Sequence, residues 1–494
     1  MRRLPALVAM LGLTAATVVA GGSAAGTPPP DAGFAGSGLA QTGRWVTDAS
    51  GRVVVLHGVN QVFKVAPYEP AADGFGDDDA AFLAQNGFDA VRVGVIWAAV
   101  EPQPGVYDDG YLTSIEATVR TLARHGIVSL LDFHQDLYNE KFQGEGAPAW
   151  AVQDGGLPNP PLGFPGNYLG NPAEWRTWDQ FWRNARASDG VGLQNHYAHA
   201  WAHVAARFAR DAAVAGYDVM NEPWPGSAGE VCATPFVGCR TFDANALTSF
   251  FRRVDTAIRS VDPAHTVYVE PNVLFSQSQR TYLGAIGDPR VGLSFHDYCS
   301  TEELTGNNLL CPQQDAGIVS AANRYAQAHA MPPLLTEFGA TTDLANIREM
   351  VSLADKYRLG WLEWAYTGND KTSSSPDGQA LVLDPSKPPS GANVRTDKLK
   401  ALAQPYPQVV AGTPVAWSFA GGVFRLTYST ARADGHGRFA AGARTRIAVP
   451  AIHFPNGYRV TVTGARIVSA PDAPELLLST SAGATTVQVS VRSA

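Results

Sequence analysis

The sequence has relatively few positive charges and does not gather them into one region. Lysine and arginine number 37 against 45 aspartate and glutamate residues, which gives a formal net charge of −8. After Arg2 and Arg3 there is no extended basic cluster. Binding to a nucleic-acid backbone requires such a basic surface, so we expect no nucleic acid as partner and favour a neutral ligand.

Long apolar runs are lacking beyond the start of the chain. After residue 25 no segment has the roughly 20 apolar residues that a membrane-spanning helix needs. Residues 1–25 combine two arginines, a short apolar run and small residues typical of a cleavage site, and are interpreted as a secretory signal peptide. We therefore expect a secreted protein, with an uncleaved membrane anchor as the alternative. Residues 26–43, rich in Gly, Pro, Ser and Ala, are expected to form a flexible linker.

Cysteine is scarce, with four residues in 494. In an exported protein these are candidates for disulfides, and although four cysteines allow three connectivities, their positions favour Cys232 with Cys239 and Cys299 with Cys311. The spacings lack the Cys-x-x-Cys form of a zinc site, and the chain has no His-Glu-x-x-His motif. We therefore expect no metal and no cofactor.

The chain does contain a regular alternation of short β-branched runs and segments with helical periodicity, from about residue 44 to 402. Eight such βα units predict an α/β fold, a closed (β/α)8 (TIM) barrel. Residues 403–494 instead show short alternating strands separated by Gly, Asn and Pro turns, which predict a C-terminal β-sandwich domain. The eight candidate barrel strands begin near Val53, Ala90, Ile127, Tyr217, Thr266, Gly292, Pro333 and Gly360.

Polar residues stand at the carboxyl ends of these strands, where a barrel of this kind carries its active site. Glu222 follows the fourth strand and Glu337 the seventh, so closure of the barrel is needed to bring the two together. Two carboxylates about 5 Å apart are the minimal machinery for retaining hydrolysis of a glycosidic bond. The other candidates at strand ends are His134, Asn221, His296, Tyr298 and Trp364.

The neighbours of the two glutamates suggest separate roles for them. The Arg92 guanidinium and the Tyr298 hydroxyl could donate hydrogen bonds to Glu337 and keep it ionised as a nucleophile. Glu222, next to Asn221 and apolar groups, could stay protonated as an acid. The Asn221 amide could donate to the sugar 2-hydroxyl, a contact that strengthens in the transition state.

Each of these assignments has a plainer alternative. Glu222 and Glu337 could be loop carboxylates without a catalytic role. His134 and His296 could be satisfied core histidines, although both lie at predicted strand ends. Trp364 could pack in the barrel core, but an indole at this position commonly stacks on a sugar ring, which we favour.

Several motifs taken together resemble a known family. "VRVGVIW", "YDVMNEPW", "SFHDY", "LLTEFG" and "LEWAY" are similar to those of family 5 glycoside hydrolases. With "HGVNQVFKVAPYEP", "LLDFHQDLYNEKFQGEGAPAW" and the C-terminal β-module, nearly the whole mature chain resembles the bacterial endoglycoceramidases, or endoglycosylceramidases. This resemblance implies hydrolysis, with retention, of the linkage between the intact oligosaccharide and ceramide of glycosphingolipids.

The resemblance also implies roles for individual residues. Glu222 is expected to be the acid/base and Glu337 the nucleophile, while Lys64, His134 and Asp136 are expected around the sugar that adjoins ceramide. The substrate would be met in membranes or micelles, so we expect transient contact with such surfaces, and otherwise a monomer without a cofactor.

Loops around the barrel mouth are expected to shape recognition. The stretch from residue 139 to about 182 is rich in aromatics and could line a sugar cleft or lipid groove, or form a self-packed lid. Residues 341–347 and 366–375 are candidates for a ceramide channel. Two alternatives for the whole protein remain: a cellulase-like or β-glucosidase-like family 5 enzyme, and a non-catalytic glycolipid-binding protein.

Overall fold

The computed structural model describes residues 38–232, 238–306, 308–368 and 377–494. The expected signal peptide at 1–25 and most of the expected linker lie outside these ranges. Among the described residues, no helix combines the length and the hydrophobicity needed to cross a membrane.

Eight parallel strands close into the expected barrel, in the order β10-β11-β4-β5-β6-β7-β8-β9. Every expected run provides one strand, which confirms the α/β barrel. Most strand residues are buried, because the barrel interior fills one face and the surrounding helices cover the other. The strands are β4 (His57–Gln61), β5 (Ala90–Val95), β6 (Val128–Phe133), β7 (Val214–Asp218), β8 (Thr266–Val269), β9 (Val291–His296), β10 (Pro333–Glu337) and β11 (Gly360–Glu363).

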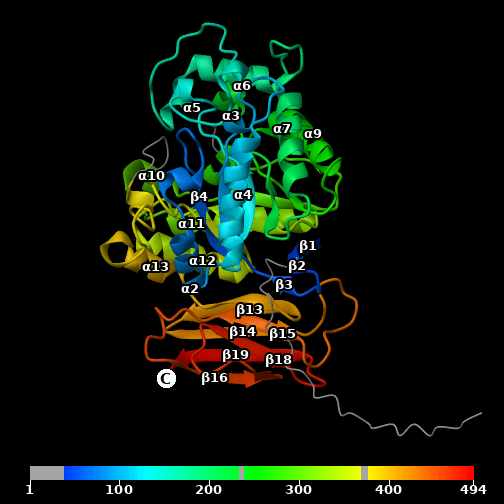
Figure 1. Ribbon diagram of the computed structural model, residues 1–494, viewed down its shortest axis with the longest axis vertical. Helices are drawn as coiled ribbons and strands as arrows, with labels where there is room; N and C mark the ends of the chain where they lie inside the picture. Colours follow the sequence, from blue (N-terminus) through cyan, green and yellow to red (C-terminus); the bar gives the residue numbers. More distant parts are fainter. Residues whose placement is uncertain (1–37, 233–237, 307, 369–376) are drawn as a thin grey trace, which may run out of the picture. The chain divides into compact units, whose positions relative to one another are not determined.

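Figure 1 shows helices α4, α7, α9 and α12 on the outside of the barrel. The α-helices are α1 (Pro70–Asp73), α2 (Asp77–Gln85), α3 (Trp97–Val100), α4 (Asp109–Arg124), α5 (Gly166–Gly170), α6 (Pro172–Trp182), α7 (Leu193–Phe208), α8 (Gly229–Cys232), α9 (Thr248–Arg259), α10 (Ser300–Thr305), α11 (Cys311–Ala328), α12 (Leu344–Tyr357) and α13 (Thr396–Leu402). Single-turn 3-10 segments are η2 (Glu140–Phe142), η3 (Ala149–Ala151), η4 (Gly226–Ala228), η6 (Val273–Gln277), η7 (Asp377–Gln379) and η8 (Gly391–Asn393), and η5 (Phe242–Leu247) is a π-helix.

One barrel connection differs from the expected eight βα units. Between β8 and β9, residues 270–290 form only the short helix η6 and no α-helix. This segment contains Pro271, Pro289 and two glycines, which interrupt helical hydrogen bonding. Helix η6 lies at the barrel mouth, where its residues line the cavity. The rest of the connection covers the barrel side without an α-helix, because Leu283 and Ile286 are buried in the barrel core and the Ala285 carbonyl accepts from Arg252 of α9.

The barrel helices follow local rules of capping and patterning. In α4 the Asp108 side chain accepts a hydrogen bond from the Tyr111 backbone, and residues on one face, such as Leu112, Ile115 and Val119, are fully buried. Helix α12 begins in the same way at Asp343, whose carboxylate accepts from two backbone N–H groups. These caps place the helix starts at the barrel mouth.

The C-terminal domain consists of two antiparallel sheets that share one hydrophobic core, as expected for a β-sandwich. The sheet orders are β1-β2-β3-β12-β15-β18-β17 and β13-β14-β19-β16. Its strands are β12 (Tyr406–Val410), β13 (Thr413–Ala420), β14 (Val423–Ser429), β15 (Arg444–Ala448), β16 (Tyr458–Thr463), β17 (Ala465–Ile467), β18 (Glu475–Thr480) and β19 (Thr486–Ser493), joined by β1 (Leu39–Thr42), β2 (Trp45–Asp48) and β3 (Val53–Val54).

The expected domain limits need two corrections. The linker was expected to reach residue 43, yet β1 already pairs with β2 from Leu39 onward. The barrel was expected to begin at residue 44, yet Val54 pairs with Val409 in the C-terminal sheet and barrel strand β4 starts at His57. The first strands therefore belong to the β-domain by their pairing, because β3 pairs with β12. Val53 packs in the β-domain core, whereas Leu39 and Val54 pack against the base of the barrel.

Both expected disulfides are present, Cys232–Cys239 and Cys299–Cys311. The second links the start of α11 to the residue before α10, directly after Tyr298 in the sequence. It therefore closes a loop beside the barrel mouth.

Aromatic stacking joins the barrel to the β-domain. The Tyr406 ring stacks on His57, the first residue of β4, with ring centroids 3.6 Å apart, and its hydroxyl donates to the Gly87 carbonyl. Trp417 of β13 donates its indole N–H to Asp355 at the end of α12. These contacts lie at the amino-terminal ends of the strands, opposite the polar strand ends.

We expect Tyr406→Ala to lower the free energy of unfolding by about 3 to 5 kcal/mol, the usual loss for a buried aromatic side chain. Urea unfolding followed by circular dichroism measures this loss. Tyr458→Ala, which truncates a half-buried tyrosine of β16, is the matched control and should cost about 1 kcal/mol. Equal losses for the two variants would contradict a special role for the junction.

Candidate active site

The barrel brings the two glutamates together at its mouth. Glu337 is the last residue of β10, and Glu222 lies four residues beyond the end of β7. One carboxylate oxygen of Glu222 and one of Glu337 lie within 4.8 Å of each other, and His296 at the end of β9 lies within the same distance of both. This separation fits the short spacing of a nucleophile and an acid in retaining enzymes, about 5 to 5.5 Å, and not the roughly 6.5 to 9.5 Å of inverting ones.

Glu337 receives two strong hydrogen bonds from protein donors. Arg92 of β5 donates from Nη1 to Oε1 at 2.6 Å, and the Tyr298 hydroxyl donates to Oε2 at 2.8 Å. Both donors favour the negatively charged form of the carboxyl group. The structure thus places the expected pair of donors on the expected nucleophile.

The Arg92 guanidinium is fully buried and has partners on several strands. Its Nε donates to Asp218 at 3.0 Å, and its Nη2 lies 3.0 Å from Asp132. The remaining N–H groups reach the side-chain oxygens of Asn60 and Asn221. Burial alone would lower the pKa of Arg92, but the surrounding carboxylates raise it by more than burial lowers it. The guanidinium therefore stays positively charged.

Glu222 sits in a turn whose backbone is unusual. Its φ of +43° lies in the left-handed region, which side chains other than glycine seldom adopt and which costs about 1 to 3 kcal/mol. Gln135 Nε2 donates to the carbonyls of both Asn221 and Glu222, at 2.8 and 3.0 Å, and Glu270 accepts from the Glu222 N–H at 3.1 Å. The turn is therefore held by side chains from two neighbouring strand ends.

The surroundings of Glu222 favour its protonated form. Burial, and secondarily the negative charge of Asp136, raise the pKa of Glu222 to about 8. His296 Nδ1 lies 2.9 Å from its Oε1, and burial lowers the pKa of His296 to about 4, so the ring is neutral near pH 7. Glu222 can therefore carry a proton at neutral pH and deliver it as a general acid.

A cluster of polar side chains next to the two glutamates surrounds Lys64. Its ammonium pairs with Asp136, lies 3.7 Å from Glu145 and sits 4.5 Å above the Trp364 ring. His134 stacks on the same indole, with centroids 5.2 Å apart. Burial opposes protonation of His134, but Asp132 and Asp136 outweigh it and raise its pKa to about 9.

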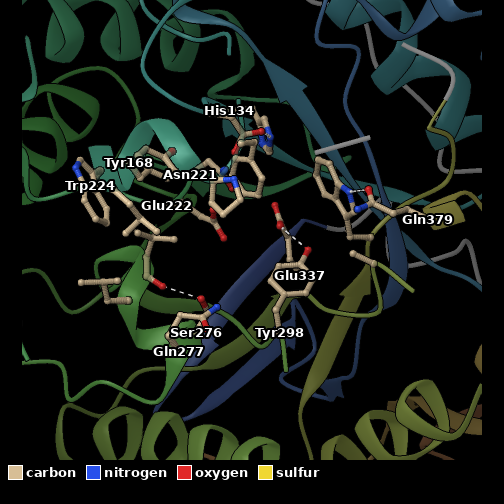
Figure 2. Close-up of a pocket in the computed structure, with 18 residues that line it drawn as sticks. His134, Tyr168, Asn221, Glu222, Trp224, Ser276, Gln277, Tyr298, Glu337 and Gln379 are labelled. Atoms are coloured by element: carbon tan, nitrogen blue, oxygen red, sulfur yellow. Dashed lines mark hydrogen bonds and ion pairs between the residues drawn. The ribbon is translucent and has the colours of Figure 1, made fainter. Parts of the chain in front are cut away.

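These residues surround a cavity of about 490 Å³. Figure 2 shows Glu222 and Glu337 between Trp224 with Tyr168 on one side and Gln379 on the other. Of the ten predicted catalytic and substrate-binding residues, seven line the cavity: His134, Asp136, Asn221, Glu222, Tyr298, Glu337 and Trp364. Lys64, Arg92 and His296 are buried directly behind this wall, in contact with lining residues.

The cavity also has an apolar wall, which includes two aromatics of the stretch 139–182. It is formed by Phe164, Pro165, Tyr168, Leu169, Trp224, Val273 and Leu274. Of the segment 341–347, expected to form a ceramide channel, no residue lines the cavity, although the adjacent Ala340 does, and residues 369–376 lie outside the described chain. The apolar wall comes instead from α5 and the residues just before it, from Trp224 after β7 and from η6 after β8.

The aromatic stretch 139–182 serves both purposes considered for it. Phe142 and Trp178 are fully buried, and Trp178 packs on Phe181 and Trp182, whereas Phe164 and Tyr168 line the cavity. The sequence analysis did not identify Gln379, which accepts from the Trp364 indole at 2.9 Å, because it lies in the short helix η7, outside the predicted strand ends.

Two clusters of donor atoms have the composition of a metal site. They are His134–Asp136–Glu145 and Glu222–His296–Glu337. In each cluster a cationic side chain already contacts a carboxylate, Lys64 in the first and Arg92 in the second, and would repel a metal ion. The donor chemistry therefore does not fit a metal, and the expectation of a metal-free enzyme stays a prediction.

Comparison with known proteins identifies the family. The family described as "Cellulase (glycosyl hydrolase family 5)" matches residues 47–370, and the "Glycoside hydrolase family 5 C-terminal domain" matches residues 404–492. The chain therefore belongs to glycoside hydrolase family 5.

Within this family the chain is a homologue of endoglycoceramidases. It is 32% identical to endoglycoceramidase I of Rhodococcus hoagii, over 88% of this chain and 84% of that protein. The structure of endo-glycoceramidase II from Rhodococcus sp. in complex with ganglioside GM3 superposes with a TM-score of 0.76 at 30% identity, covering 91% of this chain and 99% of the other. The structure of the lactosyl-enzyme intermediate of the same enzyme superposes with a TM-score of 0.74 at 31% identity, again over 91% of this chain and 99% of the other.

We expect kcat/KM to fall as the pH rises through about 8, because Glu222 must be protonated to act as an acid. Removing the charge of Asp136 stabilises the carboxylate form of Glu222, so Asp136→Asn should move this alkaline limb to lower pH. Lys64→Met removes a positive charge and should move it to higher pH. Measuring kcat/KM from pH 5 to 10 checks both shifts, and movement of the two variants in the same direction would contradict the assignment.

Proposed function

We propose that this protein is a retaining endo-β-glycosidase that cleaves glycosphingolipids between the intact oligosaccharide and ceramide. The observation that carries the proposal is the division of the cavity into two halves that meet at Glu222. One half presents polar groups and the Trp364 indole, and the other presents mainly apolar side chains such as Tyr168, Trp224 and Leu274, with the polar Ser276 and Gln277 of η6 beside them. A substrate that is a sugar on one side of the scissile oxygen and a lipid on the other matches this division.

The geometry supports a double displacement. In the first step the Glu337 carboxylate attacks the anomeric carbon while the bond to the ceramide oxygen breaks, and Glu222 transfers its proton to that oxygen. In the second step Glu222, now a carboxylate, takes a proton from a water that attacks the glycosyl ester. The oligosaccharide leaves with its original anomeric configuration, and both glutamates return to their starting states.

The relatives support the substrate class. The Rhodococcus structures contain ganglioside GM3 in one case and a lactosyl-enzyme intermediate in another. Lys64, His134 and Asp136 would surround the sugar next to ceramide, with His134 and Asp136 at the cavity surface and Lys64 behind them.

The apolar wall continues to an exposed rim that could meet a lipid surface. Tyr168 stacks on Trp224 inside the cavity and contacts Phe164 at its edge. Beyond Phe164, the side chains of Leu162 and Leu169 are 49% and 61% exposed. Residues 157–173 contain no charged side chain, so insertion among lipid tails would not bury an unpaired charge.

We propose in addition that the chain is exported. The basic and apolar start of the sequence supports this, as do the two disulfides, which form in oxidising compartments. Determining the N-terminus of the protein purified from culture medium would test it.

We expect purified protein to release free ceramide and an intact oligosaccharide from a neutral glycosphingolipid or a ganglioside. Glu337→Gln should reduce turnover by at least about a thousandfold, because the amide is a poor nucleophile, and should leave the fold intact. Mass spectrometry of the products measures both. Cellopentaose is the control substrate and should remain uncut.

Other outcomes would select the alternatives. Cleavage of cellopentaose with untouched glycolipid would point to a cellulase-like enzyme. Glycolipid binding without products, equal in the wild type and Glu337→Gln, would point to a non-catalytic binding protein.

We expect Leu162→Ser, a change outside the cavity lining, to lower activity on glycolipid in vesicles by about tenfold or more, since burying a leucine in lipid contributes about 1.5 to 3 kcal/mol. Activity on a water-soluble aryl glycoside of the same sugar should change much less, because that substrate requires no lipid surface. Ile467→Ser, on an exposed position of β17, is the matched control. An equal loss on both substrates would contradict a surface-binding rim.

A further inference from the structure

A third carboxyl group stands behind the catalytic pair. Glu270 comes directly after β8, and only 2% of its surface is exposed. It is not among the residues that line the cavity, so it does not reach the substrate. Any influence on the reaction must pass through the residues it contacts.

Those contacts converge on Glu222. Glu270 Oε2 accepts a hydrogen bond from the Glu222 backbone N–H at 3.1 Å, and Glu270 Oε1 lies 3.4 Å from His296 Nδ1. The same His296 nitrogen lies 2.9 Å from Glu222 Oε1. Glu270 therefore holds the main chain of Glu222 and lies next to the ring that contacts the Glu222 side chain.

The main-chain contact matters because the Glu222 turn is strained. With φ at +43°, this residue would relax to a more common conformation if its peptide groups were free. Glu270 holds the N–H side of the residue, and Gln135 holds its carbonyl. Loss of either contact allows the side chain to swing relative to the cavity.

A protonated Glu270 can accept the hydrogen bond from the Glu222 N–H without adding a negative charge to the site. Burial, followed by the charge of Asp218, raises the pKa of Glu270 well above its usual value. The group then accepts the Glu222 N–H through its carbonyl oxygen and adds no negative charge beside Glu337. An ionised Glu270 would instead place a second negative charge near Arg92 and weaken the stabilisation that Arg92 gives to the Glu337 carboxylate.

We propose that Glu270 is a positioning residue for the acid step, which fixes the direction in which Glu222 presents its proton to the leaving oxygen. This inference rests on the acid role of Glu222 in the proposed function. It predicts a specific defect in kcat/KM, which reports the steps up to the glycosyl-enzyme: in those steps, only leaving groups that need a proton depend on the placement of Glu222.

The test compares two glycosides of the oligosaccharide that the wild type releases from glycolipid. The benzyloxy group of the first compound, the benzyl glycoside, is a poor leaving group and must be protonated as it departs. The 2,4-dinitrophenolate of the second compound, the 2,4-dinitrophenyl glycoside, is a stable anion and departs without a proton. Glu270→Leu should lower kcat/KM for the benzyl compound by about 10- to 100-fold, the cost of misplacing a catalytic group, and for the dinitrophenyl compound by no more than about twofold.

Three further variants make the result interpretable. Glu270→Gln keeps an oxygen acceptor for the Glu222 N–H and should restore kcat/KM for the benzyl compound to within about threefold of wild type. Asp355→Asn changes a buried carboxyl at the junction with the β-domain and should leave the ratio of the two substrates unchanged. Glu222→Gln should shift the ratio most, by about 10²- to 10⁴-fold, since it removes the acid itself.

The outcomes separate the two ideas. If Glu222→Gln leaves the ratio unchanged, the acid role in the proposed function fails. Suppose instead that Glu222→Gln shifts the ratio of the two kcat/KM values while Glu270→Leu lowers kcat/KM equally for both substrates. In that case Glu270 is only structural and the positioning role is overturned. Circular dichroism verifies folding, and should Glu270→Leu not fold, Glu270→Ser, whose hydroxyl is too short to reach Glu222, takes its place with the same expected ratio.

Discussion

The buried charge of Arg92 is the constraint on which the barrel mouth depends. A guanidinium without access to water is strongly destabilising unless carboxylates and hydrogen bonds compensate it. Asp132, Asp218 and Glu337 supply three carboxylates from the ends of β6, β7 and β10. Arg92 thereby ties distant strand ends to one point and fixes Glu337 in position before any substrate arrives. A neutral residue of similar size would leave these acids unpaired and facing one another.

The same electrostatics give two identical side chains opposite tasks. Glu337 shares its oxygens with a permanent cation and a phenol, both of which stabilise negative charge. Glu222, less than 5 Å away, contacts a neutral imidazole, and burial and the charge of Asp136 keep it protonated. The difference does not come from the glutamates, which are chemically the same. It comes from the groups placed on each by neighbouring strands.

Most of the barrel and its polar wall could be predicted from the sequence, because strand periodicity is local and barrel topology gathers the strand ends. Glu222 and Glu337 were found in this way, despite their separation in the chain. The pairing of Val54 with Val409 could not be predicted, since short apolar strands carry no information about distant partners. Glu270 could have been found, because it follows the apolar run "TVYV" as Glu337 follows "PLLT". The apolar wall lies in irregular loops, whose course depends on packing and not on periodicity.

This division also separates chemistry from substrate choice. The strand ends provide the groups that act on the sugar, whereas the apolar wall is built by α5, by the loop after β7 that carries Trp224 and by the loop after β8. Tyr168 and Trp224 stack on each other from two of these segments, so each supports the other's position at the edge of Glu222. A shorter loop at either place would leave the catalytic pair intact and remove the surface that a lipid needs. In the proposed function, the leaving group is therefore recognised by loops and the sugar by the strand ends, and loops generally tolerate sequence change better than a buried charge network.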